Sequence, residues 1–135
     1  MSSLYSDTAT FSDPVFPKLA GNDIRRMWKM LLTNAKDLEV EYEIIGRDEN
    51  SDGALWNVEW NAIYTFSKTQ KTVHNFVEST IEIKDGKIIS HTDDFNFWKW
   101  ASMAFGLPGQ IFGWTPIFHK KVQEQALQSL KSFKE

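Results

Sequence analysis

Hydrophobic and polar residues alternate along several segments of the chain, as is typical of strands with one buried face. Residues 38–44 place Leu, Val, Tyr and Ile between glutamates, and residues 54–67 carry apolar or aromatic side chains at even positions. Residues 72–84 are apolar mainly at odd positions, and residues 87–95 predict a last strand with a polar middle. The turn-rich run GRDENSDG, residues 46–53, predicts a loop.

Other segments have the three-to-four-residue spacing of helices. Apolar residues recur at helical spacing from Ile24 to Leu32. The preceding Gly21-Asn22 pair is expected to end the extended segment and to cap the helix. Residues 96–105 are also predicted to be helical, followed by an apolar loop broken by Gly and Pro. Thr115-Pro116 then predicts the start of a long terminal helix. With an extended segment over residues 8–16, the pattern predicts an α+β fold.

Length and composition narrow this picture. At 135 residues the chain fits a single domain, residues 1–135. Six Trp and ten Phe indicate that rings fill much of its core or line a cavity. Fifteen basic and eighteen acidic residues include no Lys/Arg cluster long enough to neutralise a row of phosphates, so we expect no nucleic acid partner. The absence of Cys and of a leader-like N-terminus favours the cytoplasm.

The apolar stretch from Phe97 to Phe118 is interrupted by glycines and prolines, so we expect it not to span a membrane. Its sequence, FWKWASMAFGLPGQIFGW, is rich in tryptophan. We interpret it as a lid over a pocket or a dimer contact, in preference to a membrane-docking surface.

Strand register brings the unusual polar residues together. A three-residue turn around Gly86 would pair Ser79 with His91 and Val77 with Asp93. The same matching of faces across the preceding connection gives three predicted rows on the buried face, subject to a slip of two residues. They are Trp60, Ser79 and His91; Ala62, Val77 and Asp93; and Tyr64, Asn75 and Phe95.

His91 and Asp93 are therefore candidate catalytic residues. They are two residues apart on one strand face, about 6 to 7 Å between Cα atoms, so both can reach one cavity. A carboxylate on an apolar face suits general acid–base chemistry, and a neighbouring imidazole can assist it. The alternative is structural: His91, Ser79 and Asn75 satisfy one another and Asp93 caps the next helix. The expected ligand-binding residues are Trp28, Trp60, Tyr64, Asn75, Ser79 and Phe95.

A metal centre is not expected. The predicted register puts His74 on the sheet face opposite His91, and His119 belongs to the terminal helix. Three separated histidines without cysteine do not form a zinc site. We therefore expect no metal and no other cofactor.

Two segments resemble a known family. LYSDTATFSDPVFPKLAGNDIRRMW is similar to the early region of SnoaL-like proteins, of the nuclear transport factor 2-like superfamily, and IEIKDGKIISHTDDFNFW resembles their closing hairpin. The resemblance covers residues 4 to about 100. It implies a cystatin-like, cone-shaped curved antiparallel sheet packed on helices around one pocket. The terminal helix would be an addition, and we expect the first helix usual in such proteins to be absent.

This resemblance implies several functions. The superfamily includes ketosteroid isomerases, polyketide cyclases, epoxide hydrolases and dehydratases, and also non-catalytic binding proteins. Asp93 matches the carboxylate that cyclases and epoxide hydrolases carry on the closing strand, whereas NVEWNAIY lacks the Arg that an epoxide hydrolase needs. We therefore expect a homodimeric, cofactor-independent isomerase, cyclase or hydratase acting on a small apolar molecule. Asp93 would be the general acid/base, His91 its assistant and Tyr64 an oxyanion donor. The alternative is a non-catalytic binding or scaffold domain.

Overall fold

The computed structural model of the protein describes residues 4–50 and 53–134. Within this part of the chain, six strands and four helices follow one another. In chain order they are β1 (Tyr5–Ser12), β2 (Leu19–Ala20), α1 (Asn22–Asn34), β3 (Glu39–Asn50), β4 (Gly53–Phe66), β5 (Lys71–Lys84), β6 (Lys87–Asp94), α2 (Phe97–Phe105), α3 (Leu107–Phe112) and α4 (Pro116–Ser132).

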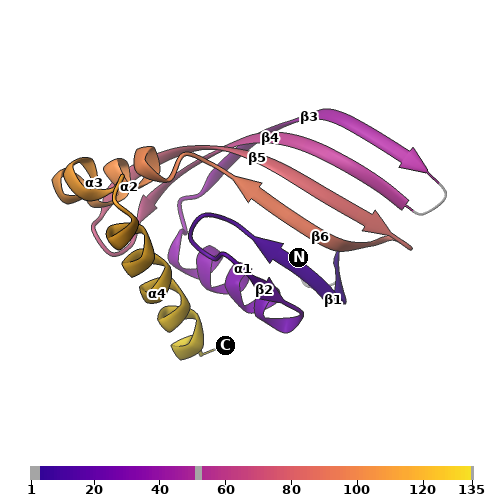
Figure 1. The fold of residues 1–135 in the computed structure, drawn as a ribbon, viewed down its shortest axis with the longest axis horizontal. Coiled ribbons are helices and arrows are strands. Elements are labelled where there is room, and N and C mark those ends of the chain that lie inside the picture. Colours follow the sequence, from indigo (N-terminus) through magenta and orange to yellow (C-terminus); the bar gives the residue numbers. More distant parts are fainter. Residues whose placement is uncertain (1–3, 51–52, 135) are drawn as a thin grey trace.

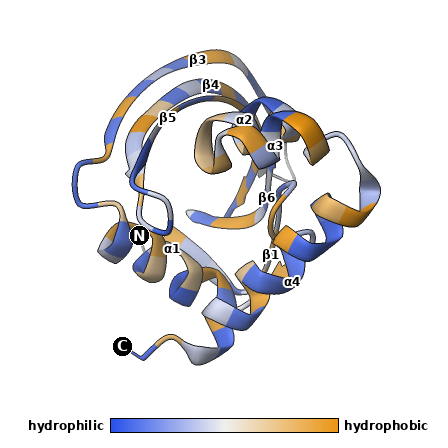
Figure 2. Cartoon of the chain, turned by 90° about the vertical axis from the view of Figure 1, so that its left-hand side faces the viewer, coloured by the Kyte–Doolittle hydropathy of each residue, from blue (hydrophilic) through white to orange (hydrophobic). Residues whose placement is uncertain are grey.

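The strands form one curved, open sheet in the order β2-β1-β6-β5-β4-β3 (Figure 1). Neighbouring strands are antiparallel except for β1 and β6, which are parallel. In Figure 2 the strands β3, β4 and β5 arch over α1, and α4 lies beside it. The predicted α+β fold with a curved sheet packed on helices is therefore confirmed.

The hairpin between β5 and β6 differs from the expected one. Asp85 and Gly86 both have positive φ, 51° and 75°, so they form a two-residue turn that pairs Lys84 with Lys87. The three-residue turn predicted from the sequence is wrong. A bulge near Ile89 then shifts the register, because Ile83 pairs with Ile88 and Glu82 with Ser90. The bulge keeps the later residues of β6 on the predicted face.

The predicted cross-sheet rows are consequently wrong in their partners. Ser79 lies opposite Asp93, and His91 lies opposite Ile81. Between β4 and β5 the register is slipped by two residues, so that Trp60 pairs with Val77. A slip of two leaves each side chain on its original face, since strand side chains alternate with a period of two.

Strand β3 and its connection to β4 also correct the sequence analysis. The expected loop over 46–53 is largely strand, because β3 continues to Asn50 and β4 begins at Gly53; residues 51–52 lie outside the described part. Val40, Tyr42 and Ile44 are exposed, which contradicts the expected buried face of this strand. The reason is position: β3 is an edge strand, paired with β4 alone.

The predicted Thr115 cap is confirmed, whereas Asn96 caps α2 in place of Asp93, the cap considered in the structural alternative. The Asn96 side chain accepts a hydrogen bond from the Lys99 N–H to begin α2, and the Thr115 side chain caps α4, with Pro116 in its first turn. Asn22 does not cap α1, since Gly21 occupies the N-cap position. The short helix α3 occupies the segment expected to be a loop. None of the described helices is long and apolar enough to span a membrane.

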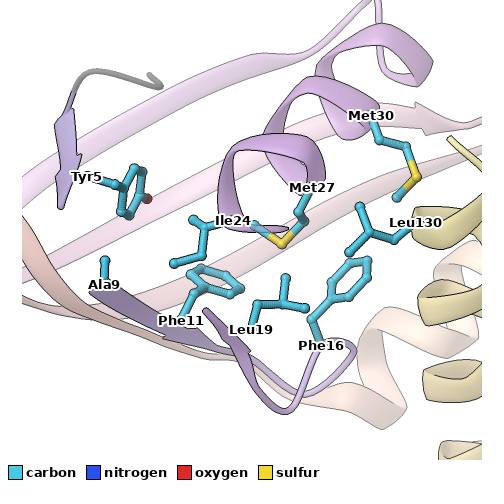
Figure 3. Close-up of a cluster of buried hydrophobic side chains, with 9 residues drawn as sticks. All are labelled: Tyr5, Ala9, Phe11, Phe16, Leu19, Ile24, Met27, Met30 and Leu130. Carbon is cyan, nitrogen blue, oxygen red and sulfur yellow. The ribbon is translucent and has the colours of Figure 1, made fainter. Parts of the chain in front are cut away.

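Two clusters of buried side chains hold the helices to the sheet. The first joins α1, β1, β2 and α4 (Figure 3), and consists of Tyr5, Ala9, Phe11, Phe16, Leu19, Ile24, Met27, Met30 and Leu130. The second packs α2 and α4 against β5, and consists of Val73, Phe97, Trp100, Ala101, Ala104 and Val122. The space between the two clusters is where the candidate site lies.

Candidate functional site

A cavity of about 240 Å³ lies between the concave face of the sheet and the helices. Side chains from β4, β5, β6, α1, α2 and α4 line it, and most of them are apolar. Six exposed lining residues mark its opening to solvent: Leu31, Leu32, Asn34, Ser67, Lys68 and Gln125. The cavity therefore opens between the end of α1, the β4–β5 turn and α4. Its mostly apolar lining with a few polar groups is typical of small-molecule sites.

The structure brings the eight predicted site residues to this region, but in two layers. Six of them line the cavity: Trp28, Trp60, Tyr64, Asn75, Asp93 and Phe95. His91 and Ser79 are buried behind Asp93 and are hydrogen-bonded to it. His91 can therefore act on a ligand only through Asp93.

Asp93 is held by two donors on one oxygen. Its Oδ1 accepts a hydrogen bond from the Ser79 hydroxyl at 2.5 Å and lies 2.7 Å from Nε2 of His91. Its Oδ2 makes no hydrogen bond to the described residues, and none of their buried polar side-chain atoms lacks a partner. The Oδ2 atom must therefore be the part of Asp93 that reaches the cavity.

The hydrogen bonds behind Asp93 have a consistent direction. The Trp28 indole N–H, which can only donate, lies 3.0 Å from the Tyr5 hydroxyl, and this hydroxyl lies 2.8 Å from Nδ1 of His91. If Tyr5 donates to Nδ1, a neutral His91 donates from Nε2 to Asp93. On the other side, Trp60 donates to Ser79, which donates to Asp93. Every donor in both series of hydrogen bonds then has an acceptor, and Asp93 is the final acceptor of both.

Tyr5 was not among the residues predicted for the site. It is buried, and its ring and that of Trp28 lie stacked near the His91 ring. The pKa of Tyr5 is raised to about 12. Burial is the main cause and the charge of Asp93 adds to it, whereas the hydrogen bond from Trp28 acts in the opposite direction. Tyr5 thus remains a protonated donor at neutral pH, which fixes the orientation of His91.

Asp13 is the second carboxylate of the cavity, and the sequence analysis did not identify it. It follows β1, and its Oδ1 accepts hydrogen bonds from the N–H groups of Val15 and Phe16, at 2.7 and 2.6 Å. Burial raises its pKa from 3.8 to about 6, against the lowering effect of these two bonds, and the charge of Asp93 adds to the rise. A carboxyl group with such a pKa is suited to exchange protons near neutrality.

Tyr64 places a hydroxyl group in the same cavity. Its oxygen accepts a hydrogen bond from the Trp100 indole at 2.9 Å, and its own hydrogen has no acceptor among the described residues. Burial raises the pKa of Tyr64, the bond from Trp100 lowers it, and the nearby charge of Asp13 raises it. Tyr64 can therefore donate a hydrogen bond to a ligand close to Asp13.

Asn75 completes the inner polar groups. It is 8% exposed and lines the cavity, yet its side chain makes no hydrogen bond to the described residues. By the same reasoning as for Asp93, its amide group must reach the cavity. The inner part of the cavity thus presents two carboxylates, one phenol and one amide among mostly apolar side chains, an arrangement that can transfer protons and bind one polar group of a ligand.

Comparison with known proteins agrees with this architecture. The model of the SnoaL-like domain matches residues 1–91 of the chain. The chain belongs to the SnoaL-like family. No curated protein sequence matches it. The family assignment expected from the sequence is confirmed. Solved structures similar to this SnoaL-like protein show that it also shares their fold.

Three solved structures illustrate the likeness. A ketosteroid isomerase-like protein from Erwinia carotovora atroseptica has a TM-score of 0.59 at 13% identity, over 70% of this chain and 77% of that one. A proposed dehydratase of the NTF2-like family from Streptomyces avermitilis scores 0.58 at 16% identity, over 70% and 80%. An LEH-like epoxide hydrolase from M. tuberculosis scores 0.52 at 18% identity, over 82% and 79%. The TM-scores establish a common fold, and the low identities leave the chemistry to the residues of this site.

Proposed function

We propose that this SnoaL-like protein is a cofactor-independent enzyme that moves protons on a small, largely apolar organic molecule, as isomerases and hydratases do. One observation supports the proposal above all others: Asp13 and Asp93 both line a predominantly apolar cavity. Placing carboxylates in such surroundings is costly for folding, and their presence in pairs is typical of acid–base sites.

In this proposal Asp13 is the base that removes a proton from a carbon next to a carbonyl group and later returns it. Its pKa of about 6 leaves it largely ionised at neutral pH while keeping it a useful acid after it has accepted the proton. Tyr64 donates a hydrogen bond to the carbonyl oxygen as negative charge develops there, and Asn75 offers a second donor.

Asp93 is the partner acid/base that gives or takes a proton at a second position of the ligand through Oδ2. His91 and Tyr5 hold its carboxylate in place and do not contact the ligand, so they are positioning residues. The role of Asp93 and His91 expected from the sequence is kept, and Asp13 is added to it.

A second function is favoured by one observation. Oδ1 of Asp93 is satisfied by Ser79 and His91 within the fold, as a purely structural carboxylate would be. The protein would then bind a small apolar ligand without changing it. Such a protein binds the same ligands as the enzyme but exchanges no protons with them.

One experiment tests both proposals. Small cyclic ketones, epoxides and fatty acids are screened for ligands that raise the melting temperature. Each ketone that binds is incubated with the protein in D₂O, and NMR follows deuterium incorporation next to the carbonyl group. We expect exchange with the native protein and none with Asp13→Asn, at unchanged ligand affinity. Binding without exchange would support the second function, and no binding of any ligand would contradict both.

A further inference from the structure

A patch of large apolar side chains lies outside the cavity, on α2, α3 and the start of α4. Its six members are each between 50% and 72% exposed, and we call them the apolar patch: Trp98, Leu107, Ile111, Phe112, Trp114 and Ile117. Much of α2 and α3 is accordingly coloured as hydrophobic in Figure 2. A monomeric protein rarely leaves so many large apolar side chains together in water without a partner.

Two hydrogen bonds tie the tryptophans of the apolar patch to the backbone of α3. Trp98 donates its indole N–H to the Gln110 carbonyl at 3.1 Å, and Trp114 donates its N–H to the Ile111 carbonyl at 2.9 Å. A Cβ at Gly113 would lie 3.0 Å from Cδ1 of Trp98, so this glycine lets the Trp98 ring lie against α3. Both indole N–H groups are satisfied within the protein, and the rings can leave water without losing a hydrogen bond.

Three exposed lysines border the apolar patch. Lys99 follows Trp98, and Lys120 and Lys121 lie three and four residues after Ile117, on the same side of α4. None of the three forms an ion pair with a described residue. The sequence has no acidic residue between Asp94 and Glu124. The surface is therefore apolar at its centre and positively charged at its edge.

We propose that the apolar patch docks on the surface of an anionic phospholipid bilayer. The tryptophans and aliphatic side chains would enter the boundary between headgroups and acyl chains, and the three lysines would contact lipid phosphates. A second copy of the chain is a poorer occupant, because face-to-face docking would bring identical cations together without acids to pair with them. The buried side of α2 contributes Trp100 and Phe105 to the cavity, so docking puts the bilayer one helix away from it.

Cosedimentation with vesicles tests the proposal. Phosphatidylcholine vesicles are compared with vesicles that contain phosphatidylglycerol. We expect binding to the anionic vesicles, and a loss of at least about tenfold in partitioning for Trp98→Ala/Trp114→Ala. Lys99→Gln/Lys120→Gln/Lys121→Gln should lose roughly a hundredfold, since each lysine near an anionic surface contributes about a factor of five.

Matched variants elsewhere on the surface separate docking from general effects. Tyr42→Ala/Phe76→Ala removes exposed aromatic side chains of β3 and β5, and Lys18→Gln/Lys36→Gln/Lys84→Gln makes the same change of net charge. Both should bind vesicles like the native protein. Equal losses in the control variants, or no binding to anionic vesicles, would overturn the proposal. So would a dimer in sedimentation velocity that Trp98→Ala/Trp114→Ala dissociates, because a second copy would then cover the patch.

Discussion

Nε2 of His91 lies 2.7 Å from Oδ1 of Asp93, two residues along the same strand, while the opposite ring nitrogen is fixed by Tyr5 from β1. Tyr5→Phe keeps the ring and removes the hydroxyl, which leaves Nδ1 of His91 and the Trp28 indole without this partner. We expect the free energy of unfolding to fall by about 1 to 3 kcal/mol in urea titrations. Tyr42→Phe, on the exposed edge strand, should change it by less than about 0.5 kcal/mol.

Asp93→Asn separates a catalytic carboxylate from a structural one. The amide oxygen can still accept hydrogen bonds from Ser79 and His91, so we expect the free energy of unfolding to change by no more than about 2 kcal/mol. Proton exchange with a bound ligand should fall by at least about a hundredfold, the usual contribution of a general acid or base. If the rate falls only in proportion to the folded fraction, Asp93 is structural.

Asp13→Asn should make the protein less sensitive to pH. The pKa of Asp13 is raised from 3.8 to about 6 on folding, so the unfolded chain releases this proton first as the pH rises. The native protein therefore loses stability from about pH 4 to pH 6, by roughly 3 kcal/mol from this group. The asparagine keeps an acceptor for the N–H groups of Val15 and Phe16 but does not ionise.

Urea unfolding of both proteins across this pH range measures the effect. As the pH rises, the unfolding free energy of Asp13→Asn should increase relative to that of the native protein. Above about pH 7 the difference between the two should stay constant. A difference that does not change with pH would show that Asp13 is not desolvated in the folded state.

Ala62→Leu tests the cavity itself. Ala62 is buried in β4 and lines the cavity, so a leucine at this position would occupy part of the space available to a ligand. We expect at least about tenfold weaker ligand binding by calorimetry, with a small change in stability because an existing space is filled. Ala54→Leu, at the other end of the same strand and outside the cavity lining, is the matched control and should bind normally. Unchanged affinity in Ala62→Leu would mean that ligands bind elsewhere.

The inward orientation of the site residues could be predicted from the sequence because it depends only on strand parity. A two-residue slip between β4 and β5 changed the partners of Trp60 but not its face. The bulge near Ile89 could not be predicted, since the sequence pattern favours a longer turn and a regular ladder as much as a short turn and a bulge. Both turn geometries place Asp93 on the inward face of the sheet. Its orientation was therefore predicted correctly although the register was wrong.

Tyr5 and Asp13 were missed for a different reason. Their place in the site depends on β1 lying parallel to β6, and the register pairs Phe11 with His91 across most of the chain. No local pattern reports such a pairing. The Asp13-Pro14 turn is visible in the sequence, but only its position beside the cavity distinguishes it from an ordinary surface turn.

The contact between Tyr5 and His91 spans 86 positions of the chain. Contacts of this separation carry the largest cost of loop closure and are typically late events in folding. During synthesis β1 must wait for β6 to leave the ribosome before the hydrogen-bonded chain to Asp93 can close. The hydrogen bonds behind Asp93 thus report complete folding: partly folded chains can contain the central hairpins and still lack an organised candidate site.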